Sequence, residues 1–276
     1  MSKSQRVEVK DVGFFIGGLC DRRKVTWRQL LVLDIDDAND KTLEKLREWL
    51  NGHAYIIHST HSSTPQEPRY RVVAPLDRLV LADEYGGIMR VLHEQFELPL
   101  DVSTFDFNRI MFLPSVPRDV EYYFETGEGE PLCVNDILAN KPNWSDLSAV
   151  QVPTKVRVQD PKFKGGIIGA FCAKVSIREA LETYLSDVWR KESNGRYTLI
   201  GASTVGGGVI YEDKYLYSNH SSDPYLGHCH NAYDVVRLYK FGDGKQGEAA
   251  MSQLCESIGI RAESGKTHFL TIESME

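Results

Sequence analysis

Two aspartates one residue apart, Asp34 and Asp36, end an apolar stretch that begins at Leu31. Residues two apart on a β-strand point to the same face, so both carboxylates would project together. Like charges at this spacing repel each other and are costly to bury unless a cation lies between them. Carboxylate oxygens suit Mg²⁺ or Mn²⁺, and such a site indicates metal-assisted phosphoryl chemistry. The alternative is a pair of water-exposed strand-end carboxylates, or a cap for a helix that starts near Asp40.

Residues with phosphate-binding chemistry follow the next two apolar segments. Ser59 and His61 share a face if the strand over 54–58 continues through them, and they could hydrogen-bond the phosphates of a nucleotide. Otherwise they are a polar strand end before a turn. Arg69 and Arg71 alternate with a tyrosine on the following strand, and two guanidinium groups on one face bind phosphate strongly. An edge strand protected by charge would carry the same pattern.

A third polar segment follows Leu100. Asp101 could complete a three-carboxylate metal site, and Asp106 competes for the place of third ligand. Asn108 and Arg109 come next and enter an apolar strand, with Arg109 as a possible phosphate contact beside the metal site. The alternative for Asp101 is a loop carboxylate or a helix cap.

The elements that would position these residues alternate between strands and helices. Strand patterns occur over 31–37, 54–58, 69–76, 109–113 and 120–124, and helical patterns over 40–51 and 82–96. This alternation favours an α/β or α+β layered fold.

The rest of the chain predicts a second domain. The polar segment 140–165 has three prolines and predicts a linker. The later patterns predict helix over 166–190, a hairpin or meander over 196–219, and helices over 231–240 and 247–258. We therefore expect a domain over 1–140, a linker over 141–165 and an accessory domain over 166–276.

Composition limits the class of protein. The 276 residues are 42% hydrophobic and 26% charged, as in ordinary globular proteins, and no apolar run reaches the ~20 residues of a membrane span. The N-terminus lacks the apolar segment of a signal peptide, and the five cysteines are scattered, which favours a cytoplasmic protein with reduced thiols. The net charge of -7 argues against a protein that coats nucleic acid non-specifically.

Taken in order, the three motifs resemble those of the archaeo-eukaryotic primase superfamily, and most closely its primase-polymerase branch in bacteriophages, plasmids and integrated mobile elements. The motifs are Asp-x-Asp at Asp34 and Asp36, Ser-x-His at Ser59 and His61, and Leu100-Asp101 followed by Asn108-Arg109. The stretch FDFNRIMFLPSVPRD over 105–119 also resembles phage primase domains. The resemblance covers residues 10–140 and favours Asp101 over Asp106 as third acid.

The resemblance implies a fold and an activity. The fold would be α+β (α/β), a primase catalytic core with an RRM-like β-sheet followed by a smaller α+β domain. The activity would be template-dependent DNA primase or polymerase chemistry, a two-metal nucleotidyl transfer in phage or mobile-element DNA replication in a bacterial host. Two Mg²⁺ or Mn²⁺ ions would be held by Asp34, Asp36 and Asp101. The nucleotide-binding residues would be Ser59, His61, Arg69, Arg71, Asn108, Arg109 and Arg118.

The same resemblance implies partners. They are a single-stranded DNA template, a primer, NTP or dNTP, and a replicative helicase that is either a separate partner or a fused domain; no membrane is expected. Two other classes of protein remain open. One is a non-catalytic replication module that binds nucleotides or single strands. The other is a phosphatase with Asp34 and Asp36 on its nucleophile strand, although Ala38 stands where that family carries Thr or Val.

Residues 161–276 resemble the region that follows the primase core in phage primases, and their role is open. Metal-binding residue types gather at His220, Asp223, His228, Cys229 and His230. They lack the paired Cys-x₂-Cys spacing of zinc sites. Aromatic and basic residues that could stack single-stranded bases are Tyr211, Tyr215, Tyr217 and Tyr225 with Arg196 and Lys214. An aromatic β core explains the same residues.

Overall fold

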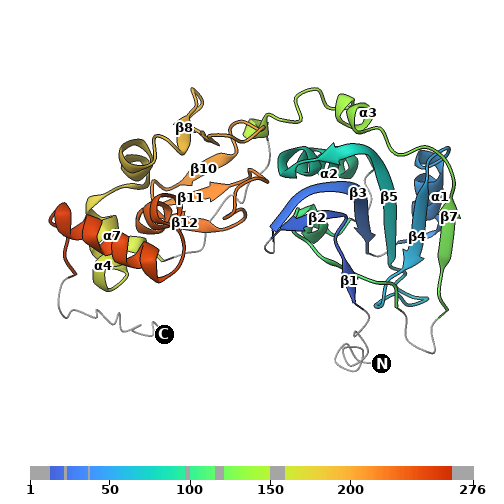
Figure 1. The fold of residues 1–276 in the computed structure, drawn as a ribbon, viewed down its shortest axis with the longest axis horizontal. Helices are drawn as coiled ribbons and strands as arrows, with labels where there is room; N and C mark the ends of the chain where they lie inside the picture. Colours follow the sequence, from blue (N-terminus) through green and yellow to red (C-terminus); the bar gives the residue numbers. More distant parts are fainter. Residues whose placement is uncertain are drawn as a thin grey trace, which may run out of the picture. The chain divides into compact units, whose positions relative to one another are not determined.

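The computed structural model describes residues 13–21, 24–36, 38–96, 100–115, 121–149 and 159–262. The chain divides into two compact units, residues 1–145 and 146–276 (Figure 1). Each unit has its own apolar core. The boundary at residue 145 falls within the polar segment 140–165, which includes the short 3₁₀ turns Leu147–Ala149 and Pro161–Phe163.

The first unit is built on a five-stranded sheet with strand order β2-β3-β5-β4-β7. The strands are β2 (Gly18–Asp21), β3 (Lys24–Ile35), β4 (Tyr55–Ser59), β5 (Tyr70–Val80) and β7 (Phe124–Gly127). All neighbouring strands are antiparallel. The helices are α1 (Asp40–Trp49), α2 (Ala82–Phe96) and α3 (Val134–Ala139). The predicted mixed α+β fold class is confirmed.

Helices α1 and α2 cover one face of this sheet. Alternate residues of β3, Leu31, Leu33 and Ile35, are fully buried in the same core as Leu46 of α1 and Ile88 of α2. Helix α1 starts sharply because Asn39 and Thr42 form a reciprocal capping box, in which the Asn39 side chain accepts from the Thr42 N–H at 3.1 Å. Burial of this apolar face supplies most of the driving force for the two-layer arrangement.

The opposite face of the sheet is bordered by a small strand pair. Strand β1 (Phe14–Phe15) pairs antiparallel with β6 (Met111–Phe112). After α2, the chain makes a single antiparallel bridge between Leu100 and Ile35 at the end of β3. The prediction of a strand over 109–113 was therefore too long. The strand predicted over 120–124 instead runs over Phe124–Gly127, and α3, β1 and β2 were not predicted.

The second unit has a five-stranded antiparallel sheet with strand order β12-β11-β10-β9-β8. Its strands are β8 (Trp189–Lys191), β9 (Tyr197–Leu199), β10 (Gly208–Tyr211), β11 (Tyr215–Ser218) and β12 (Cys229–Asn231). Its helices are α4 (Gly166–Lys174), α5 (Ile177–Glu179), α6 (Ala232–Val236) and α7 (Lys245–Ser257), with π-helical turns over Ala180–Tyr184 and Arg237–Phe241.

The predicted meander over 196–219 is confirmed by β9, β10 and β11. The prediction of helix to residue 190 was wrong at its end, because Trp189 starts a strand whose indole packs in the core. In the part of the chain that the structure describes, no helix is both long and apolar enough to cross a membrane.

Candidate active site

Asp34, Asp36 and the backbone of Asp101 lie together at the end of β3. Asp34 and Asp36 flank the fully buried Ile35, so their side chains project on the face opposite the helices. Leu100 bridges to Ile35, and the backbone N–H of Asp101 donates to the carbonyl oxygen of Asp34 at 2.8 Å. In an antiparallel pair, directly opposed residues share a face. The chain that leaves α2 thus brings Asp101 beside the Asp-x-Asp pair.

Arg71 is the direct partner of Asp34. The two residues lie opposite each other in the β3–β5 register. The guanidinium donates to both carboxylate oxygens, with Nε–Oδ1 at 2.5 Å and Nη2–Oδ2 at 2.8 Å. Its Nη1 donates to the Phe112 carbonyl at 2.8 Å. The side chains are only 11% and 14% exposed. This bidentate pair neutralises the carboxylate that the apolar strand would otherwise leave uncompensated.

Arg69 pairs with Asp36 at 2.9 Å in a more open position, with side chains 29% and 43% exposed. The Nε atom of Arg69 is buried and has no hydrogen-bond partner among the described residues. Its backbone N–H donates to the Ser63 hydroxyl at 3.0 Å, which fixes the backbone at the start of β5. The two arginines predicted to bind phosphate therefore lie beside the carboxylates, each bonded to one of them.

Ser59 and His61 have different surroundings. Ser59 lies opposite Tyr70, which lies opposite Ile35, so its side chain is on the helix-covered face. Its hydroxyl accepts from the Tyr123 N–H at 2.9 Å. His61 is nearly buried, and its Nδ1 lies 3.1 Å from the hydroxyl of Ser115. Nucleotide binding by these two residues stays a prediction.

The Asn108–Arg109 segment is fastened to β3. The side-chain oxygen of Asn108 accepts from the Val25 N–H at 3.0 Å. Arg28 donates from Nε to the Phe107 carbonyl at 2.8 Å and from Nη2 to the Arg109 carbonyl at 2.6 Å. Thus Asn108 holds the loop, while the side chain of Arg109 stays exposed. Arg118 lies outside the described residues.

Arg28 was not predicted from the sequence. It is fully buried, and its guanidinium lies 5.0 Å from the Tyr85 ring centroid and 5.7 Å from that of Phe107. These rings and the two carbonyls compensate the buried charge. The signal that could have found it is the alternation over 24–30, which extends β3 seven residues before the apolar run and turns Arg28 inward.

His58 is a second residue that sequence reasoning missed. It lies opposite Arg71 in the β4–β5 register, in the same cross-strand row as Asp34. Its Nδ1 lies 2.8 Å from the Ser59 carbonyl and donates to it, because a carbonyl can only accept. Burial lowers the pKa of His58, and the charge of Arg71 lowers it further. The ring is therefore neutral at pH 7, and Arg71 is the cation in this part of the row.

The carboxylates fit a divalent cation by donor type, because Mg²⁺ and Mn²⁺ prefer oxygen ligands. Within the described residues, no three His, Cys, Asp or Glu side chains are already arranged to hold a metal ion. Both oxygens of Asp34 accept from Arg71. A cation at this carboxylate would therefore share the oxygens with the guanidinium or displace it.

In the second unit, His220 and Asp223 have hydrogen-bond partners, whereas the buried Nε2 of His230 has none among the described residues. The Nε2 of the fully buried His220 accepts from the Leu199 N–H at 3.1 Å, so its Nδ1 carries the proton and donates to the Thr204 hydroxyl at 2.8 Å. Asp223 accepts from the Tyr239 hydroxyl at 2.7 Å, and burial, then this carboxylate, raise the pKa of Tyr239. A metal cluster is absent from the described part of this unit as well.

Fold and site together define an α+β protein with a carboxylate- and arginine-lined sheet end. The chain belongs to the VapE N-terminal domain family, whose model matches residues 1–153. This family is associated with primase-polymerases, and the family relationship predicted from the motifs is confirmed at that level. No curated protein matches the chain. Among solved structures, the AEP domain of the cyanophage S-2L primase-polymerase is similar at 12% identity and a TM-score of 0.36, over 50% of this chain and 76% of that chain.

Proposed function

We propose that the first unit is a template-dependent DNA primase or polymerase that joins nucleotides in phage or mobile-element DNA replication. The observation that carries this proposal is the backbone pairing that brings Asp101 to the strand end of Asp34 and Asp36, with Arg71 and Arg69 bonded to those two carboxylates. Carboxylates that hold divalent ions, next to arginines that bind phosphate, are the two components that nucleotidyl transfer needs.

Asp34, Asp36 and Asp101 would hold two Mg²⁺ or Mn²⁺ ions. When bound, such ions lower the pKa of the primer 3′-hydroxyl and neutralise charge on the departing pyrophosphate. The protein's own part is to position the substrates and to complement their charge. Arg109 offers an exposed guanidinium on a loop whose backbone is fixed from β3, which suits contact with the triphosphate of the incoming nucleotide.

The arginine pairs have a place in this proposal. Arg71 keeps its bond to the Phe112 carbonyl when Asp34 turns away, so the guanidinium remains in place and gains two free donors for phosphate oxygens. Arg69 already has an unpartnered Nε within the described structure. The ion pairs would therefore keep the site charge-balanced without substrate, and would exchange partners when nucleotide and cations bind.

The test is nucleotide incorporation on single-stranded DNA with Mg²⁺ or Mn²⁺, with and without a primer. We expect synthesis by the native chain and a loss of more than about 1,000-fold in Asp34→Ala/Asp36→Ala, because the charge complement of the reaction is gone. Asp101→Asn should be similarly impaired, whereas Asp106→Asn should keep most activity. The reverse result for the last two variants would assign the third acid to Asp106.

A second candidate is a non-catalytic module that binds nucleotides or single strands. The observation that favours it is the full pairing of both Asp34 oxygens with Arg71, which gives a stable site without any cation. Binding of nucleotide or DNA without synthesis under any metal would support this candidate. Hydrolysis of a simple phosphomonoester would instead support the phosphatase class. A replicative helicase as partner or further domain belongs to the first proposal and is tested by stimulation of synthesis.

A further inference from the structure

The sheet face that carries the carboxylates also carries apolar side chains that solvent reaches. Phe124 is 54% exposed, and Ile56 and Tyr122 are each 39% exposed. An antiparallel sheet with helices on one side usually presents polar residues on its other, solvated face. Neighbouring exposed apolar side chains of this kind mark a surface that contacts a ligand or partner.

Strand register connects these side chains to the candidate active site. Phe124 lies opposite His58, His58 opposite Arg71, and Arg71 opposite Asp34. The four side chains therefore share one face and form a row across β7, β4, β5 and β3. Adjacent strands are ~4.8 Å apart, so the row spans about 14 Å, the length of a few stacked nucleotides.

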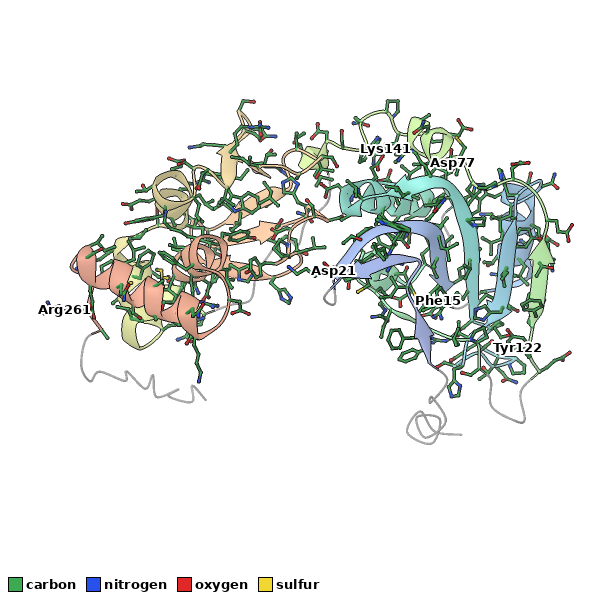
Figure 2. All side chains as sticks on the ribbon, in the orientation of Figure 1. Phe15, Asp21, Asp77, Tyr122, Lys141 and Arg261 are labelled. Carbon is green, nitrogen blue, oxygen red and sulfur yellow. The ribbon has the colours of Figure 1, made fainter. Side chains whose placement is uncertain are left out.

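At the β7 end of this row, the exposed rings of Tyr122 and Phe124 lie beside the buried ring of His58. Tyr122 and Phe124 are stacked, with ring centroids 6.2 Å apart and an interplanar angle of 21°. The His58 ring lies 6.4 Å from Tyr122 at 32°. Tyr122 lies at the end of the sheet where β7 begins (Figure 2). Since β7 is an edge strand, an extended strand could pass over these rings without meeting a further β-strand.

We propose that Tyr122 and Phe124 form a base-stacking platform for single-stranded DNA, along which the template approaches the end of β3. The inference rests on the proposed function, because the occupant is chosen by continuity with that site. Every base has an aromatic face, so stacking on side-chain rings is tolerant of sequence, as template-directed synthesis requires. A sheet face with exposed rings is one of the surfaces that proteins use to bind single strands.

The test is binding of a fluorescein-labelled oligo-dT by the full chain, measured by anisotropy in EDTA without nucleotide. Tyr122→Ala/Phe124→Ala should bind about 10-fold to 100-fold more weakly. Tyr122→Phe/Phe124→Tyr keeps both ring faces and should bind within about threefold of the native chain. The matched control is Phe163→Ala, which removes a 69% exposed ring in the second unit and should leave binding unchanged.

An abasic oligonucleotide of equal length separates stacking from contact with phosphates. The native chain should bind it more weakly than oligo-dT, and the double alanine variant should bind both strands alike. Native-like binding of oligo-dT by the alanine variant, or an equal loss on both strands, would overturn the proposal. If the alanine variant fails to fold, Tyr122→Leu/Phe124→Leu retains apolar volume without a π face and takes its place.

Two further readouts separate this inference from the proposed function. Ring-dependent DNA binding without any nucleotide incorporation would reject the polymerase and keep the platform. Incorporation with native-like binding by the double alanine variant would reject the platform alone. Sedimentation of the native chain and of the variant tests a second copy as occupant: a dimer that the variant abolishes, with DNA binding unchanged, would also reject the platform.

Discussion

The two units hold their polar side chains against similar sheets in different ways. In the first unit, Asp36 pairs with Arg69 in an open position, and Asp34 pairs with Arg71 in a nearly buried one. In the second unit, His220 is enclosed between Leu199 and Thr204 and is bonded at both ring nitrogens. An ion pair at an open edge can exchange partners with a phosphate or a cation. An enclosed group cannot, because each lost bond leaves an unsatisfied partner. A charge in an accessible ion pair is therefore a better indication of a ligand site than a cluster of polar residue types.

Arg71→Ala should have the largest effect on stability. It leaves the Asp34 carboxylate, which is only 14% exposed, without its cation, and should destabilise the first unit by about 3 kcal/mol. Hydrogen exchange measured peptide by peptide resolves this unit from the second, where protection should not change. Asp34→Ala/Arg71→Ala should recover most of the loss. No recovery in the double variant would show that Arg71 acts through the Phe112 carbonyl instead.

His220→Phe should have the next largest effect, in the second unit. It removes the acceptor of the Leu199 N–H and the donor to Thr204, so protection of β9 and β10 should fall by about 2 kcal/mol. Thr204→Val removes one of these two bonds and should cost about half as much. EDTA should leave the native protection of this unit unchanged. A loss of protection in EDTA would indicate a metal site at His220 and would contradict its bonding by Leu199 and Thr204 alone.

Glu125 carries a charge on the helix-covered side of the first sheet that is held by several hydrogen bonds, and its contribution to stability should depend on pH. It accepts from Arg47, Tyr55 and Tyr123, and the Arg47 hydrogen bond is the main reason that its pKa falls to about 2. A carboxyl whose pKa is lowered by folding contributes stability above its unfolded pKa, near 4.5, and loses that contribution as pH falls toward 2. Glu125→Gln should therefore cost about 1 kcal/mol at pH 7 and little at pH 2.

The measurement is unfolding of the first unit at pH 7, 4 and 2, as the difference between native chain and variant, so that contributions from other carboxylates cancel. Tyr55→Phe is the control, because it removes one donor and leaves the Arg47 pair in place. A difference between native and Glu125→Gln that does not shrink on acidification would contradict the lowered pKa.

Local patterns predicted the elements best where the pattern was long. The helix over 82–96 was predicted with the bounds that the structure shows, since its apolar period is regular and a proline follows at residue 99. Strand β3 was predicted from residue 31, although it begins at Lys24, because Arg28 interrupts the apolar pattern while pointing inward. The buried charge of Arg28 is hydrogen-bonded to two carbonyls about 80 residues away, and no local sequence pattern shows such a contact.

Some features of the candidate site also follow from local sequence patterns, and others depend on pairing between distant segments. The shared face of Asp34 and Asp36 follows from strand alternation and needs no tertiary information. The place of Asp101 beside them depends on the single bridge between Leu100 and Ile35, and the pairing of Arg71 with Asp34 depends on register between two strands. Spacing along the chain fixes neither. The role of His58 was missed because its neighbour Ser59 carries the recognisable motif, while the register places His58 in the row with Asp34.

Arg69→Ala should have the smallest effect on stability and the clearest separation of stability from function. Its pair with Asp36 is 29% and 43% exposed, and exposed ion pairs contribute less than about 1 kcal/mol. The loss of protection in β5 should therefore be far smaller than for Arg71→Ala.

If Arg69 exchanges its carboxylate for phosphate, the same variant should weaken nucleotide binding, measured by titration calorimetry, by about 10-fold. Lys141→Ala, which breaks a similarly exposed pair with Glu94, is the control and should change neither quantity appreciably. Native nucleotide affinity in Arg69→Ala would show that Arg69 does not leave Asp36 to bind phosphate. The accessible ion pair of the first unit would then have no role in nucleotide binding.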